Sequence, residues 1–204
     1  MPHEELERIC SLCSARDMAE DRYFFWFLHE NYYSSPTLRS LGDRRFCRLH
    51  AERLLLSDNN QLSATFEFLL QVECTRLKEA DHRTPPRRVR EPKTPQVNTC
   101  PVCEVGETAA LVEARRFLTE MANEAARKEF TDGPGLCSTH LWSMRVLADA
   151  GAWNFLRADA LQRMRRLNEE MALYFHRLDY RFRDEERGQE QTAWRRALRF
   201  FWLG

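Results

Sequence analysis

Eight residues of the type that binds metal ions stand at one repeated spacing in this chain of 204 residues. Each of two Cys-x-x-Cys pairs is followed, after 33 residues, by a Cys-x-x-His pair, and the second set lies 90 positions after the first. Chance seldom produces eight such residues at a constant offset, so the pattern predicts two Cys₃His metal sites in a duplicated chain. The predicted ligands are Cys10, Cys13, Cys47, His50, Cys100, Cys103, Cys137 and His140.

The repeat extends beyond the ligands. At the same offset Phe27 matches Phe117 and Leu28 matches Leu118, which supports an internal duplication. Between the halves, four prolines and four basic residues predict an extended linker. The expected organisation is a helical metal-binding repeat over 1–83, a Pro/Arg-rich linker over 84–99, a second helical metal-binding repeat over 100–183 and a C-terminal amphipathic helix over 184–204.

The hydrophobic pattern predicts an all-α protein. Apolar residues recur at a spacing near 3.6 in six segments, whereas no alternating run rich in Val, Ile or Thr predicts a strand. The second ligand pair of each half should begin a helix, so that its histidine lies one turn after its cysteine and faces the same ion. The expected helices cover 14–32, 48–57, 61–82, 104–122, 138–149 and 153–183.

The distance between the ligand pairs predicts a break in each long helix. A straight helix over 104–130 would end about 40 Å from its start, and six further residues recover only about 20 Å. If one half closes its own site, its chain must therefore double back. In the first half Ser35 could cap a new helix with Pro36 at its first position. In the second half Asn123 is the equivalent, and Gly133–Gly135 would turn the chain into the second ligand pair.

The ligand types favour zinc. Thiolate and imidazole ligands suit tetrahedral Zn²⁺, and a pair separated by two residues supplies two corners from one turn. Four protein ligands leave no open position, which favours a structural role. An iron–sulfur cluster is the alternative cofactor, because three cysteines and a histidine can also hold one. The pairing is open: duplication favours a site within each half, while interleaved pairs would give one Cys₄ and one Cys₂His₂ site.

Composition narrows the function classes. Lys and Arg together number 31, as do Asp and Glu, so the net charge is zero and nucleic-acid binding is disfavoured. No apolar run is long enough to predict a membrane span, and the first residues lack the pattern of a signal peptide. These features predict a cytoplasmic protein, where thiols stay reduced and bind metal. Cys74, the seventh cysteine, lies on an apolar helix face and is expected to be buried.

The motifs resemble an uncharacterised bacterial family of duplicated metal-knuckle proteins. The resemblance rests on each Cys-x-x-Cys knuckle, the long helix after it, and the Cys-x-x-His that follows an apolar residue. The ending, from Asp179–Arg183 through Gly188 to Trp194–Ala197, resembles that family too. Before the second pair the family form is Gly-aromatic-Cys; Phe46-Cys47 departs from it, and Gly135-Leu136-Cys137 nearly keeps it. The resemblance covers most of the chain and implies the fold and the metal without naming an activity.

The functional prediction is a zinc-binding cytoplasmic protein of unknown pathway that acts as a binding or scaffold protein, with the zinc structural. The alternative is an iron–sulfur redox or sensor protein with Cys₃His ligation. No residue stands out as a general base, so the sequence leaves an enzyme open but leans against one. A protein partner is expected, with the linker or the C-terminal helix as a contact surface, although a short amphipathic helix of this kind more often docks on its own domain. On that helix Trp194, Ala197, Leu198 and Phe201 recur at helical spacing.

Overall fold

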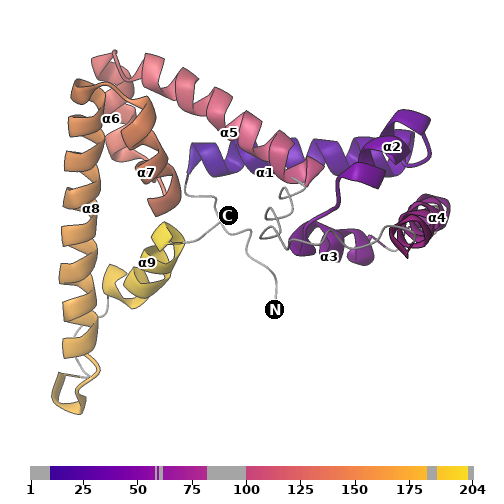
Figure 1. Cartoon of the computed structure of the whole chain (residues 1–204). Helices are drawn as coiled ribbons and strands as arrows, with labels where there is room; N and C mark the ends of the chain where they lie inside the picture. Colours follow the sequence, from indigo (N-terminus) through magenta and orange to yellow (C-terminus); the bar gives the residue numbers. More distant parts are fainter. Residues whose placement is uncertain (1–9, 58, 60–61, 82–99, 183–187, 202–204) are drawn as a thin grey trace, which may run out of the picture. The chain divides into compact units, whose positions relative to one another are not determined.

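The protein is described here by a computed structural model that covers residues 10–57, 59, 62–81, 100–182 and 188–201. The predicted linker over 84–99 and residues 184–187 lie outside these described residues. Within them every regular element is a helix, which confirms the all-α prediction (Figure 1). The α-helices are α1 (Ser11–Trp26), α2 (Ser35–Asp43), α3 (Arg48–Leu56), α4 (Leu62–Asp81), α5 (Pro101–Glu120), α6 (Glu124–Asp132), α7 (Ser138–Leu147), α8 (Ala150–His176) and α9 (Ala193–Phe201).

Both long helices that follow a Cys-x-x-Cys pair break where the sequence predicted a break. α1 continues as a π-helical segment, η1 (Phe27–Asn31), before α2 begins. Ser34, one residue earlier than predicted, caps α2 by accepting a hydrogen bond from the amide of Thr37, and Pro36 lies in the first turn. In the second half Asn123 caps α6, as predicted, by accepting a bond of 2.9 Å from the amide of Ala125.

The chain divides into two compact units. Unit 1 contains the described residues of 1–15 and 109–204, and unit 2 contains those of 16–108. The division falls inside α1 and α5, so each unit receives the beginning of one of these helices and the later part of the other. The units thus do not coincide with the two repeats seen in the sequence, whose boundaries stay a prediction about the sequence.

The core of unit 1 joins the start of α1 to the end of α5. Leu12 packs in one cluster with Phe117 of α5, Met121 just after α5, Met144 of α7 and Leu156 of α8. Because Leu12 lies in the first turn of α1 while Phe117 lies in the last turn of α5, the two helices meet here with opposite ends. Cys10 and Cys137, two of the predicted ligands, belong to the same cluster.

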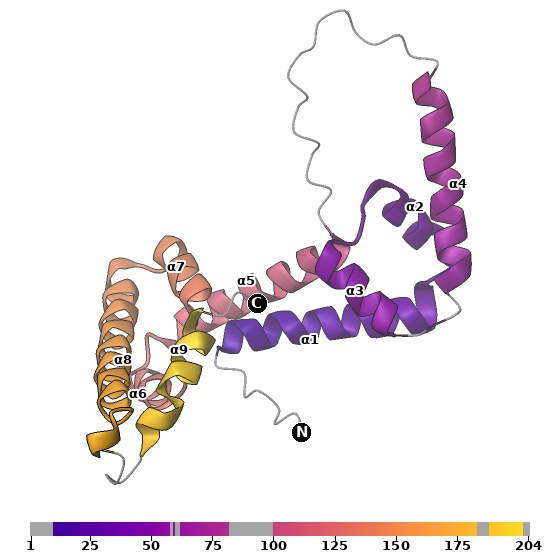
Figure 2. The same cartoon turned by 90° about the horizontal axis from the view of Figure 1, so that it is seen from below.

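The core of unit 2 repeats this arrangement with the roles of the two helices exchanged. Phe24 and Phe27, at the end of α1 and in η1, pack with Val102 at the start of α5. Leu41 of α2, Leu54 of α3 and Leu62 of α4 complete the cluster, which also contains the predicted ligand Cys100. α2 packs along α4 in the same unit (Figure 2).

The C-terminal helix packs on its own unit. Figures 1 and 2 both show α9 alongside α8, and α9 also contacts α7. Ala193 is fully buried, and Phe200 packs against the core of unit 1. The carboxylate of Glu190, just before α9, accepts hydrogen bonds from the amide of Gly188 and the guanidinium of Arg177. These bonds, chiefly the one from the Gly188 amide, lower the pKa of Glu190 to about 2. A charged anchor thus fixes the start of this helix.

Cys74 is exposed, so the prediction that it is buried was wrong. It lies on α4, whose contacts with other elements are mainly with α2, and the apolar pattern around Cys74 is therefore left facing solvent.

Among the described helices, none combines the length and the apolar character that crossing a membrane requires.

The α6 cap gives a test of the predicted break. Asn123→Ala removes the acceptor for the Ala125 amide and should lower the free energy of unfolding by about 1 kcal/mol. Urea denaturation would measure the loss. Asn123→Asp keeps a capping oxygen, so a similar loss in both variants would contradict the capping role.

Candidate metal centre

All four ligand pairs stand at helix N-termini. Cys10 and Cys100 directly precede α1 and α5, so that Cys13 and Cys103 fall in the first turns of these helices. The sequence had placed the first helices after these pairs, whereas the structure includes the pairs in them. The other two pairs agree with the prediction, because Cys47 and Cys137 are the N-cap residues of α3 and α7. The positive end of a helix dipole stabilises a nearby thiolate, so the position of each pair favours the deprotonated cysteines that bind metal.

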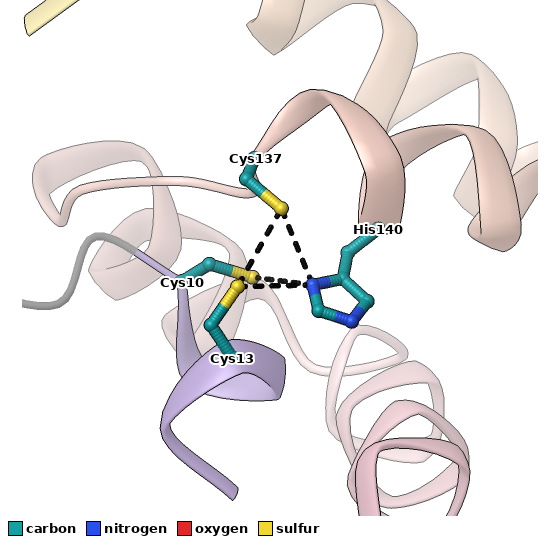
Figure 3. Close-up of side chains that lie close together, drawn as sticks. All are labelled: Cys10, Cys13, Cys137 and His140. Atoms are coloured by element: carbon teal, nitrogen blue, oxygen red, sulfur yellow. Dashed lines mark hydrogen bonds between the residues drawn. The ribbon is translucent and has the colours of Figure 1, made fainter. Parts of the chain in front are cut away.

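In unit 1 the side chains of Cys10, Cys13, Cys137 and His140 converge on one point (Figure 3). The Nδ1 atom of His140 lies 3.4 Å from Sγ of Cys10 and 3.2 Å from Sγ of both Cys13 and Cys137. The two sulfur atoms of Cys13 and Cys137 are 3.6 Å apart. Cys10 and Cys137 are buried, while Cys13 and His140 are half-buried.

Unit 2 holds the second group, formed by Cys47, His50, Cys100 and Cys103. Here Nδ1 of His50 lies 3.2 Å from Sγ of Cys47 and 3.4 Å from Sγ of Cys100 and of Cys103. The sulfur atoms of Cys47 and Cys103 are 3.7 Å apart. His50 is only 1% exposed, so this histidine lies deeper in the protein than its counterpart His140.

These distances fit one ion per group. In each group the four ligand atoms all lie within 4.8 Å of one another. A tetrahedral ion with metal–sulfur bonds of about 2.3 Å and metal–nitrogen bonds of about 2.0 Å requires sulfur–sulfur separations near 3.8 Å and sulfur–nitrogen separations near 3.5 Å. The separations found are close to those values, so both groups could hold a metal ion with four protein ligands.

The pairing differs from the one that the sequence favoured. Each Cys-x-x-Cys pair groups with the Cys-x-x-His pair of the opposite half, so the expectation that each half closes its own site was wrong, as was the interleaved alternative of one Cys₄ and one Cys₂His₂ site. The reason is the length of the return path. α5 has 20 residues and spans about 30 Å, whereas the nine residues of α6 recover about 13 Å. Cys137 therefore stays near the end of α5, where the start of α1 supplies Cys10 and Cys13.

The clustered thiols shift the pKa values of the ligands. A hydrogen bond with Cys13 lowers the pKa of Cys10, and the same interaction raises the pKa of Cys13. Hydrogen bonds with Cys10 and Cys137 raise the pKa of His140 to about 9. In unit 2, burial and a hydrogen bond with Cys47 raise the pKa of Cys103 to about 12. Cys13 and His140 in unit 1 and Cys103 in unit 2 thus hold their protons more tightly, and a divalent cation would displace these protons on binding.

Sequence reasoning missed a carboxylate behind one of the histidines. Nε2 of His50 donates a hydrogen bond of 3.1 Å to Oε2 of Glu20, on α1, and the Glu20 side chain is buried. The other carboxylate oxygen of Glu20 accepts a bond of 3.0 Å from Nε of Arg16. Metal-binding histidines commonly donate their second N–H to such a carboxylate, which fixes the ring orientation. Glu20 belongs to no recognised sequence motif, so the sequence gave no indication of this contact.

Arg163 is the second residue whose role the sequence concealed. The helix that carries it, α8, is rich in charged residues, whose side chains most often face solvent. Instead its guanidinium donates to the carbonyl oxygens of Phe130, Thr131 and Gly133, at the end of α6, and to the carboxylate of Asp159. It thereby holds the turn that leads into Cys137. Gly135 in this turn has φ of 81°, and a Cβ there would lie 3.0 Å from Nε of Arg163.

Comparison with known proteins gives a family for the chain. The model of a family of unknown function, DUF6062, matches residues 4–202. The chain belongs to this family. Membership confirms the expectation of an uncharacterised family and agrees with the resemblance over most of the chain. None of the curated proteins and none of the solved structures compared with the chain matches it. For this DUF6062 protein the site geometry is therefore the main guide to function.

The Arg163 contacts predict a stability effect. Arg163→Ala leaves three carbonyl oxygens and the buried Asp159 without this donor, so the free energy of unfolding should fall by roughly 2–3 kcal/mol. Arg163→Lys keeps the charge but not the planar fork, and its loss should be intermediate. Urea denaturation compares both with Arg165→Ala, an exposed site on the same helix where little change is expected. Equal stability of the Arg163→Ala and Arg165→Ala variants would contradict the role of Arg163.

Proposed function

We propose that this protein binds two zinc ions as structural elements and acts as a binding or scaffold protein in the cytoplasm. One observation carries the proposal: the chain builds two groups of three cysteines and one histidine, each with its donor atoms within 4.8 Å of one another. Cys₃His with four protein ligands is a donor set typical of structural zinc. No ligand position is left for water or substrate, which supports a role other than catalysis.

The compactness of the groups supports a single ion over an iron–sulfur cluster. A cluster places several irons and sulfides between its ligands, so the ligand atoms must surround a larger body than one ion. In each group four of the six separations between donor atoms are 3.2–3.7 Å, close to the edges of one tetrahedron, and all six are within 4.8 Å. Zinc also suits the mixture of thiolate and imidazole, and it brings no redox chemistry of its own.

Structural zinc would explain how each of the two small units is held together. Each site ties the start of one long helix to the start of a helix far away in the sequence, and in unit 1 Cys10 and His140 are 130 positions apart. Zinc binding to such sites contributes about 10 kcal/mol or more to folding. The ligands Cys10, Cys100 and Cys137 lie inside the hydrophobic clusters, so the metal and the core would stabilise the same contacts.

Exposed apolar side chains support a role in binding a protein partner. In unit 2 Leu55 and Leu56 are 81% and 86% exposed at the end of α3. Leu55 also lines a groove of about 630 Å³ with Phe66 and Leu70 of α4. Large exposed apolar patches are common at protein contact sites. A scaffold held by zinc would present such surfaces without taking part in chemistry.

Metal content is the direct test. Protein purified anaerobically without added metal should contain about two zinc ions per chain and show no visible absorption. Cys137→Ser should contain about one, with a lower melting temperature, because one site loses a ligand. Cys74→Ser, which changes an exposed cysteine outside both groups, should keep two. Iron with sulfide and a brown colour would instead support the redox or sensor protein.

Double variants test the pairing. Cys13→Ser with Cys137→Ser damages one site twice, so about one zinc ion should remain. Cys13→Ser with Cys47→Ser damages both sites, and no tightly bound zinc should remain. Sites closed within each half would reverse these two results. Zinc analysis of the two purified variants, side by side, therefore distinguishes the pairings.

A further inference from the structure

The two metal centres differ in what stands behind the histidine. In unit 2 the ring of His50 lies between the thiols, on its Nδ1 side, and the carboxylate of Glu20, on its Nε2 side. Both His50 and Glu20 are buried, at 1% and 6% exposed. In unit 1 His140 is half-buried, and within the described part of the chain its Nε2 atom has no hydrogen-bond partner.

A glycine on the neighbouring helix leaves room for the Glu20 side chain. A Cβ at Gly106 of α5 would lie 2.7 Å from Oε1 of Glu20 and 2.9 Å from Cγ of Arg16. No side chain fits there, so the glycine allows Glu20 and its partner Arg16 to lie between α1 and α5. Glu20 is thus held by the His50 ring and the Arg16 guanidinium, in the space that Gly106 leaves open.

Within the described residues, this arrangement is found at one of the two centres. The position 90 residues after Glu20 is occupied by Ala110, which has no acceptor to offer His140. The position 90 residues before Gly106 is occupied by Arg16. Both members of the Glu20–Gly106 pair are therefore changed in the other half, while all eight ligands are kept. The two centres have the same ligands and unequal support.

We propose that Glu20 makes the Cys47/His50/Cys100/Cys103 centre the permanent one and leaves the Cys10/Cys13/Cys137/His140 centre exchangeable. This inference rests on the proposed zinc function. The carboxylate keeps Nδ1 of His50 aimed at the ion and increases the donor strength of the ring. The half-buried His140 can turn away from its ion more easily, which opens a coordination position to a competing ligand. Unit 1 is then the part of the protein that gives up or takes zinc.

The release of zinc to a chelator tests this. The two-zinc protein is mixed with excess 4-(2-pyridylazo)resorcinol, and zinc transfer is followed by absorbance. Two phases of equal size are expected. Cys137→Ser, which keeps only the unit 2 centre, should show the slow phase alone, and Cys103→Ser should show the fast phase alone. Glu20→Ala should accelerate the slow phase by about 10- to 100-fold and leave the fast phase unchanged.

Two more variants keep the result interpretable. Glu52→Ala removes an exposed glutamate that pairs with Arg48 at the same i,i+4 spacing as Glu20 and Arg16, and both phases should stay as in the original protein. Glu20→Gln keeps an acceptor oxygen without its charge, so a smaller acceleration of the slow phase is expected. This variant carries the test if Glu20→Ala does not fold.

The outcomes separate the two proposals. A single release rate for both zinc ions, or a slow phase that neither Glu20 variant changes, overturns the inference while zinc binding itself stands. Acceleration of both phases by Glu20→Gln also overturns it, because the residue would then act on the whole fold. Absence of zinc from the original protein overturns the proposed function instead.

Discussion

The meeting of two helix N-termini at each ligand group is the contact on which the rest of the structure depends. Four partial positive charges from helix ends, two per group, face six thiols and two imidazoles. Each meeting closes a long loop; in unit 1, Cys10 and His140 are 130 positions apart. Closing such a loop costs chain entropy, which a strong contact must offset. A metal ion would supply that contact, and the apolar clusters around Cys10 and Cys100 then pack on a fixed frame.

Exchange of ligand pairs between the halves follows from helix lengths and not from the ligands. A long outward helix and a short returning one leave the second pair of a half at the far end of its own first helix. The first pair of the other half is found there, because α1 and α5 meet with opposite ends in both cores. An ancestral half need not close its own site, since two copies of one half can complete each other's ligand sets equally well.

The sequence predicted much of the fold and the eight Cys and His residues that come together in the two groups, but not how these residues pair or which residues surround them. Ligand spacing and apolar periodicity are local patterns, so the helices, the cap at Asn123 and the helix starts at Cys47 and Cys137 could be predicted. The pairing could not, because both halves have the same spacing and either arrangement satisfies it. Glu20 and Arg163 act through contacts with residues 30 or more positions away, and nothing in their neighbourhoods distinguishes them from surface charges.

Identical ligands do not make identical centres, and the duplication shows where the difference arises. The eight Cys and His residues are of the same types in both groups, whereas the burial of the histidine and the presence of a carboxylate behind it differ between them. Two differences between the repeats on α1 and α5, Glu20 against Ala110 and Gly106 against Arg16, change the support of one histidine without disturbing the spacing of any ligand. A duplicated protein can thus keep one centre for stability and let the other acquire a different exchange rate.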